Sequence, residues 1–150
     1  MRLAVFALFV GGALPVCSAP PQPCGLLRAA DGPTIVVRRL GGNIRPTGVA
    51  IFADGRVVPA DSSSAAMPLA LPQRVSARDV ASIASDARTR GFWTLPSSST
   101  HRPTQPPDEA RQSIAVHLTC GSHESTYPEN SEPSAFRALL GRIDALLGQR

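Results

Sequence analysis

The sequence predicts an α+β domain in which an antiparallel sheet of about five strands carries two helices on one face. Three observations predict this fold. A β-branched and apolar run ends at a Gly-Gly pair, an Asp-Gly pair separates two further apolar runs, and two later segments have apolar residues at helical spacing. The expected order of elements is β-β-β-α-β-β-α.

The first three strands are expected at residues 34–40, 48–52 and 56–58. The Gly-Gly pair that follows the first run is a turn signal. The Asp-Gly pair lies between the second and third runs, and such a pair between apolar residues is the strongest short-range hairpin signal. These two strands therefore form a hairpin.

The first helix is expected between Ser76, which caps its N-terminus, and Gly91, which ends it in the left-handed conformation. Phe92 and Trp93 follow at once, and we expect both to pack the end of this helix onto the sheet. A second helix is expected at residues 131–147. The apolar positions recur at helical spacing: Val80, Ile83, Ala84 and Ala87 in the first helix, and Phe136, Leu139, Leu140, Ile143, Leu146 and Leu147 in the second.

The last two strands are expected at residues 114–120 and 124–127, joined by a turn at residues 121–122. Apolar residues alternate with other residues along the first of them, so one of its faces belongs to the core, and Cys120 is its last core-facing residue. The other face of the sheet is exposed to solvent, covered by the N-terminal leader or used for binding. The sequence does not choose among these three.

Two connections are longer than a fold requires, at residues 59–73 and 96–108. Both are rich in proline and small polar residues. Residues 67–71 alternate and could add an edge strand, which stays an open alternative. Long loops often carry binding contacts, so these two are the predicted binding segments.

Residues 1–18 have the layout of a signal peptide: one arginine, an apolar run, then small residues. The apolar run at residues 3–16 is shorter than the roughly 20 residues that a membrane-spanning helix needs. We expect cleavage before Ala19, then a proline-rich leader at residues 19–33 and a single domain at residues 34–148. The expected location is secreted, periplasmic or otherwise in the cell envelope.

The three cysteines divide into one in the signal region and two in the mature chain. Thiols of one exported domain usually pair, so we predict a disulfide between Cys24 and Cys120. A reactive thiol at Cys120 is the alternative. A second alternative takes Leu14-Pro15-Val16-Cys17 as a lipoprotein box, in which a lipidated Cys17 anchors the protein to the membrane.

The net charge of +4 comes from arginine alone, because the chain has fifteen arginines and no lysine. These arginines are spread along the chain without a block of like charges, so we expect no nucleic-acid partner. Mild attraction to anionic surfaces is the most that the charge implies.

The chemistry-bearing residues do not form a recognisable site, and we predict no catalytic, cofactor-binding or metal-binding residues and no cofactor. His117, His123 and Glu124 lie within one expected hairpin, but their spacing matches no zinc pattern. Asp108 and Glu109 are adjacent in a loop and cannot be held at the separation that acid-base catalysis requires. No Gly-x-Ser-x-Gly motif or phosphate-binding loop is present.

Several segments together resemble the emfourin-type domain, a small bacterial inhibitor of thermolysin-like metalloproteases, and equally some exported bacterial domains of unknown function. The segments are Arg39-Leu40-Gly41-Gly42, Ala53-Asp54-Gly55, Gly91-Phe92-Trp93-Thr94-Leu95-Pro96, the alternating strand at 114–118 and the apolar final helix. The resemblance covers residues 34–147. It implies an α+β fold and an inhibitory activity, and it assigns no inhibitory residue.

The sequence therefore favours a secreted, non-enzymatic binding domain whose partner is an extracellular protein such as a protease, which it would inhibit. The alternative is a lipid-anchored envelope protein with a structural or assembly role. An enzyme that uses Cys120, or the pair His117 and His123, ranks below both.

Overall fold

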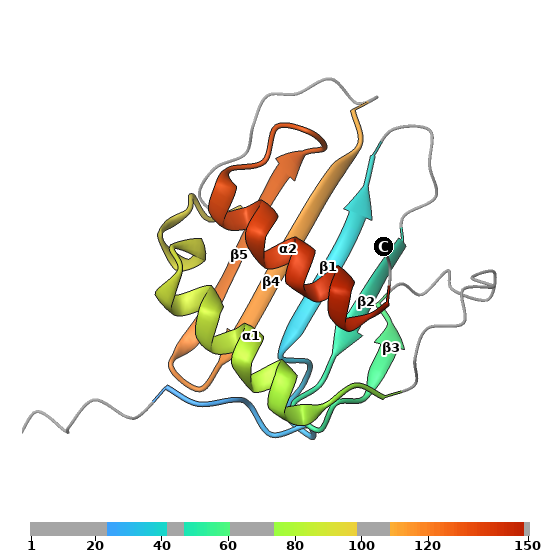
Figure 1. The fold of residues 1–150 in the computed structure, drawn as a ribbon, viewed down its shortest axis with the longest axis vertical. Helices are drawn as coiled ribbons and strands as arrows, with labels where there is room; N and C mark the ends of the chain where they lie inside the picture. Colours follow the sequence, from blue (N-terminus) through green and yellow to red (C-terminus); the bar gives the residue numbers. More distant parts are fainter. Residues whose placement is uncertain (1–23, 42–46, 61–73, 99–108, 149–150) are drawn as a thin grey trace, which may run out of the picture.

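The computed structural model describes residues 24–41, 47–60, 74–98 and 109–148. Its elements follow in the order β1 (Ile35–Leu40), β2 (Thr47–Ile51), β3 (Val57–Pro59), α1 (Ala77–Thr89), the 3₁₀ turn η2 (Phe92–Thr94), β4 (Arg111–Leu118), β5 (Gly121–Pro128) and α2 (Ser134–Leu146). The five strands form one antiparallel sheet, and both helices lie on the same face of it (Figure 1). The predicted α+β fold is confirmed.

The strand order is β3-β2-β1-β4-β5, so the first strand in the sequence is the central one. Ile35 of β1 lies opposite Ile51 on one side and Val116 on the other. The β2–β3 and β4–β5 pairs are local hairpins, whereas β1 pairs with β4, which the chain reaches only after β2, β3 and α1. The pairing of β1 with β4 therefore unites the two halves of the chain.

The main core lies between the sheet and the helices. We call this side of the sheet the helix-covered face, and its buried strand residues are Ile35, Ile51, Val57, Ile114, Val116 and Leu118. Phe92 and Phe136 are fully buried against them, with ring centroids 6.2 Å apart. Trp93 contacts this core but is only partly buried, so Phe92 alone of the two is fully enclosed.

Helix α1 begins and ends at the expected residues. The Ser76 hydroxyl accepts a hydrogen bond from the Asp79 backbone N–H at 3.4 Å, and Gly91 follows the helix with φ of 85°. This left-handed glycine turns the chain directly into η2. It thereby places Phe92 beneath the helices.

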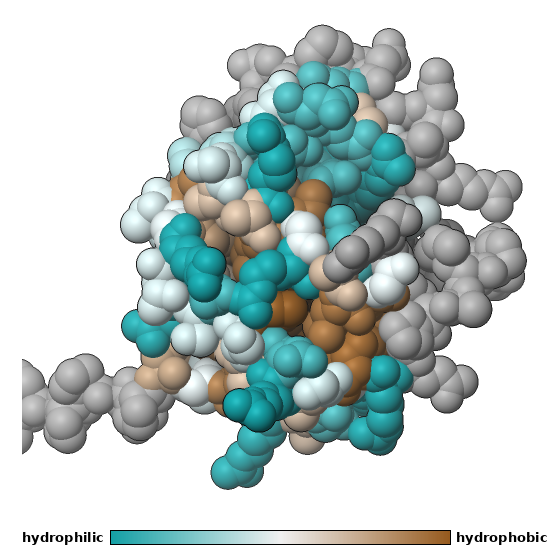
Figure 2. Space-filling model, in the orientation of Figure 1, coloured by the Kyte–Doolittle hydropathy of each residue, from teal (hydrophilic) through white to brown (hydrophobic). Residues whose placement is uncertain are grey.

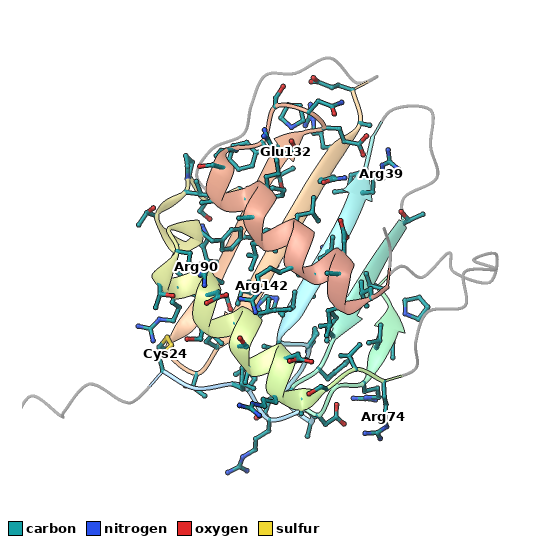
Figure 3. The ribbon with its side chains drawn as sticks, in the orientation of Figure 1. Cys24, Arg39, Arg74, Arg90, Glu132 and Arg142 are labelled. Carbon is teal, nitrogen blue, oxygen red and sulfur yellow. A yellow bond between two sulfur atoms is a disulfide. The ribbon has the colours of Figure 1, made fainter. Side chains whose placement is uncertain are left out.

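An ion-pair cluster connects the two helices. Asp86 of α1 pairs with Arg90 one turn later, at 3.2 Å, and with Arg142 of α2. Arg142 also donates to the Ser82 hydroxyl at 3.1 Å. Arg90 and Arg142 accordingly lie near each other between the helices (Figure 3).

The hairpin formed by β4 and β5 corrects the sequence prediction. Strand β4 starts at Arg111 and stops at Leu118, and Leu118 lies directly opposite Gly121. The turn therefore consists of Thr119 and Cys120, not of residues 121–122. Cys120 continues the apolar alternation in the sequence but lies in the turn, because the register pairs Leu118 with Gly121; its sulfur there is at bonding distance from Cys24.

Helix α2 also begins later than its periodicity suggests, at Ser134 rather than residue 131. Pro133 occupies its N-cap position with an extended backbone. A proline disfavours helical geometry in the residue before it, so Glu132 and the residues before it stay outside the helix. The apolar stripe is otherwise as expected, with Phe136, Leu139 and Ile143 buried.

Candidate functional site

The N-terminal part of the described chain is fixed to the tip of the β4–β5 hairpin. The sulfur atoms of Cys24 and Cys120 lie at disulfide distance, and their Cα atoms are 4.9 Å apart. Beside them, the Gly25 N–H donates to the Thr119 hydroxyl at 2.8 Å, and the Thr119 N–H donates to the Gly25 carbonyl at 3.0 Å. A cysteine pair in this position suits an oxidising, extracellular environment.

The same segment shows on which face of the sheet the start of the described chain lies. Leu26 forms a bridge with Leu118 and packs against the core on the helix-covered face. The segment then crosses the end of the sheet below α1 (Figure 1). The leader residues from Cys24 to Leu26 therefore belong to the helix side of the sheet and do not cover its opposite face.

The two histidines of the hairpin point to opposite faces. His117 lies opposite Ser122 and His123 lies opposite Val116, and successive residues of a strand face opposite sides. His123 therefore faces the helices, while His117 faces away from them. The two imidazoles cannot bind one metal ion, and the described residues contain no group of three or more metal-ligand side chains that could hold one.

His117 and Ser122 form a polar pair on the outer side of the hairpin. The Nδ1 atom of His117 and the Ser122 hydroxyl are 2.8 Å apart. The neighbouring carboxylate, Glu124, instead accepts a hydrogen bond from the Ser113 hydroxyl at 2.7 Å. Among the residues that the structure describes, no carboxylate orients His117 as the base of a serine nucleophile would require, and the geometry supports a structural pair.

His123 lies among aromatic rings at the edge of the core. Its ring centroid is 5.2 Å from that of Phe92 and 5.5 Å from that of Trp93, and its Nε2 atom is 3.2 Å from the Ser125 hydroxyl. Burial lowers the pKa of His123 because the charged imidazolium loses contact with water. No local sequence pattern indicates this environment, because it depends on the pairing of β5 with β4.

A polar contact joins the far end of β1 to the residue that follows β5. The Nη2 atom of Arg39 donates to Glu129 Oε2 at 2.6 Å, and Arg39 Nε contacts the other carboxylate oxygen. The hydrogen bond from Arg39 lowers the pKa of Glu129, and the same bond raises the pKa of Arg39. This ion pair is partly exposed and has a structural role between two strand ends.

The face of the sheet opposite the helices carries a second apolar cluster. We call it the helix-free face, and Val36, Ala50 and Ala115 form its centre, with exposed fractions of 7%, 6% and 5%. Phe52, Val58 and Ala60 pack around them and keep part of their surface exposed. All six residues lie in or next to β1 to β4, and neither helix lies on this side (Figure 1).

Arginines surround this cluster. Arg38 lies two residues after Val36 in β1, so its side chain projects from the same face of the sheet. The Arg56 guanidinium lies 4.0 Å above the Phe52 ring, a cation–π contact. Arg111 lies at the end of the β1–β4 pair, and Glu124 is the single carboxylate that the described strands place on this face. The helix-free face therefore has an apolar cluster at its centre and positively charged side chains around it.

One sequence feature of β1 indicates apolar residues on the helix-free face. Residues 35–37 are all apolar, and an uninterrupted apolar run indicates a strand with apolar contacts on both faces.

On the opposite, helix-covered face, the apolar surface gathers near the C-terminal end of α2, beside β2 and β3 (Figure 2). There Val49 and Leu146 pack against the main core but stay partly exposed.

Several predicted features lie outside the described residues. They are the signal peptide at 1–18 with Cys17, and the greater part of both predicted binding loops, at 61–73 and 99–108. Among the helices of the described ranges, none is long and apolar enough to cross a membrane.

Comparison with protein-family models, with curated proteins and with solved structures finds no match to this chain. The resemblance to the emfourin-type domain therefore stays a prediction. The class that the fold defines is a small α+β domain with five antiparallel strands and two helices on one face.

Proposed function

We propose that this protein is an exported, non-enzymatic domain that binds an extracellular protein through the helix-free face of its sheet. The observation that carries the proposal is a group of partly exposed apolar side chains, Phe52, Val58 and Ala60, around the buried centre Val36, Ala50 and Ala115, on a face that neither helix covers. Apolar surface with a polar rim is typical of protein interaction sites.

The rim defines the chemistry of the partner. Arg38, Arg56 and Arg111 give this face a positive charge that the carboxylate of Glu124 only partly offsets. Complementary charge favours association and like charge opposes it. The partner is therefore a protein with an acidic surface around an apolar contact, and a second copy of this chain, with the same arginines, is disfavoured.

Export is supported by the cysteine pair and by the first residues of the sequence. A Cys24–Cys120 disulfide persists in an oxidising compartment, and residues 1–18 have the composition of a signal peptide. In the same setting the resemblance to emfourin makes an extracellular protease the first partner to test. Binding across the sheet would inhibit such an enzyme by occupying its surface.

The inhibitor form of the proposal is tested by incubating the mature protein with thermolysin-like and serine proteases. We expect inhibition at micromolar concentration or below. The variant Arg38→Glu/Arg56→Glu should weaken it about tenfold or more, because both changes reverse the charge of the rim. No inhibition by the unmodified protein at micromolar concentration would remove the inhibitor form.

The matched control is Arg28→Glu/Arg78→Glu, which changes the net charge equally at two exposed arginines outside the helix-free face. It should inhibit like the unmodified protein. Equal loss in both double variants would mean that only overall charge matters. That result would remove the helix-free face from the proposal.

The lipid-anchored alternative depends on Cys17. Mass spectrometry of the mature N-terminus distinguishes the secreted form from the lipid-anchored form, since acyl chains on Cys17 establish the anchor. A free Ala19 at the N-terminus excludes it.

A further inference from the structure

A cavity of about 250 Å³ lies beside the cysteine pair, on the opposite side of the sheet from the helix-free face. It is formed by the Cys24–Leu26 segment, the end of β4 and the C-terminal half of α1, and its main lining residues are Cys24, Leu26, Ala81, Ala84, Arg88 and Leu118. Cys24 lies beside the end of α1 (Figure 3). The cavity exists because small residues on α1 leave space where the N-terminal segment bridges to Leu118.

The lining has an apolar interior and one charge. Leu26, Leu118 and the two alanines supply aliphatic surface, while Arg88 is the single ionisable side chain of the lining. Arg88 lies in the last turn of α1 and is exposed. It forms no ion pair with the part of the chain that the structure describes, whereas Arg90 and Arg142 nearby are both paired with Asp86.

We propose that this cavity binds the hydrocarbon chain of a fatty carboxylate, with the carboxylate held by Arg88. An aliphatic interior selects an apolar chain, and an unpaired guanidinium at its mouth selects a negatively charged head. The cavity is large enough to take several methylene groups of such a chain. A single-chain acid such as octanoate fits both requirements.

The test is a titration of the ¹⁵N-labelled oxidised protein with octanoate below its micelle concentration, followed by NMR. We expect saturable amide shifts at Ala81, Ser85 and Leu118. The affinity should rise roughly fourfold for each methylene from butanoate to octanoate, because each buried methylene adds a similar increment. Shifts that do not saturate, or that miss these residues, would overturn the proposal.

Two variants test separately how the hydrocarbon chain and the carboxylate of the ligand contribute to binding. Ala81→Leu fills the cavity and should abolish the saturable shifts, while Arg88→Gln should lower octanoate affinity about tenfold. Arg78→Gln, on the exposed part of the same helix, should bind like the unmodified protein. Octanol should bind the unmodified protein more weakly than octanoate, and equal binding would overturn the assignment of Arg88.

This inference is independent of the protein-binding proposal. The charge-reversed variant Arg38→Glu/Arg56→Glu alters the other face and should keep octanoate binding. Loss of protease inhibition in that variant, with octanoate binding retained, supports both. Loss of octanoate binding in it would show that the cavity is not the site.

Discussion

Cys24 and Cys120 are 96 residues apart in the sequence, yet their Cα atoms are 4.9 Å apart in the structure. The contact joins the N-terminal end of the described chain to the tip of the β4–β5 hairpin. It encloses the β2–β3 hairpin, the whole of α1 and the non-local β1–β4 pair within one loop. The position of this pair determines the first prediction.

Replacing both cysteines, in Cys24→Ser/Cys120→Ser, should lower the free energy of unfolding by about 2 to 5 kcal/mol, because the unfolded chain regains the freedom that the long loop lost. Urea denaturation of the oxidised protein and of the variant measures the difference. Alkylation of the native protein checks the premise. Two free thiols in the native product would contradict it.

The fully buried Phe92 should matter more to stability than the partly buried Trp93. Phe92→Ala removes a ring that packs against Phe136 and should cost about 3 to 5 kcal/mol through the cavity left behind. Trp93→Ala should cost less, since part of the indole is already in solvent. Denaturation midpoints of the two variants measure this. Equal losses would mean that the indole is as important to the core as the phenyl ring.

Two glycines should respond to alanine with opposite sign. Gly55 has φ of 82°, and a Cβ there would lie 2.1 Å from the Val75 carbonyl oxygen. Gly55→Ala should therefore destabilise the protein by about 1 kcal/mol or more, through both strain and clash. This glycine is where the first hairpin meets the start of α1, since its carbonyl accepts from the Val75 N–H at 2.8 Å.

The matched substitution is Gly141→Ala in α2. No atom lies within 4 Å of a Cβ built on this glycine. Alanine should stabilise the helix by about 1 kcal/mol, because glycine is the poorer helix former. Thermal unfolding of both variants gives the two signs. A loss of stability in Gly141→Ala would show that this helix face has a contact which the substitution disturbs.

Stability should fall as the pH drops below about 6.5, the usual pKa of histidine, because of His123. Burial lowers its pKa in the folded protein, so the unfolded chain takes up the proton first. The stabilising contribution is complete above the unfolded pKa and is lost as the pH falls toward the lower, folded value. Urea denaturation as a function of pH measures the slope.

His123→Gln should reduce this pH dependence because it removes the partly buried imidazole whose pKa burial lowers. The control is His117→Gln, which removes the histidine on the other face of the same hairpin. A smaller slope in His123→Gln than in this control assigns the pH dependence to the ring beside Phe92 and Trp93. An unchanged slope in His123→Gln would assign the pH dependence to other groups.

Local patterns predicted the elements because their causes are local. The Ser76 cap, the left-handed Gly91 and the Asp-Gly hairpin each act within a few residues. The errors came where local and long-range forces compete. The apolar period suggested that Cys120 ends a strand, whereas its contact with Cys24 accompanies a two-residue turn; proline geometry shortened α2 at its start.

The candidate binding features could not be predicted from the sequence. The apolar cluster on the helix-free face needs Val36, Ala50 and Ala115 from three strands to lie side by side. The cavity beside the cysteine pair needs Leu26 to bridge to Leu118 below α1. Neither arrangement follows from periodicity, because each depends on which strands become neighbours.

The sequence by itself determined the kind and order of the elements, because hydrophobic period, caps and turn residues act over short distances. The tertiary structure alone decided the strand order, the opposite orientations of His117 and His123, and the meeting of arginines with apolar side chains on one face. The physical reason is register: pairing between distant strands fixes which side chains become neighbours, and a shift of one residue would turn a strand's side chains to the other face.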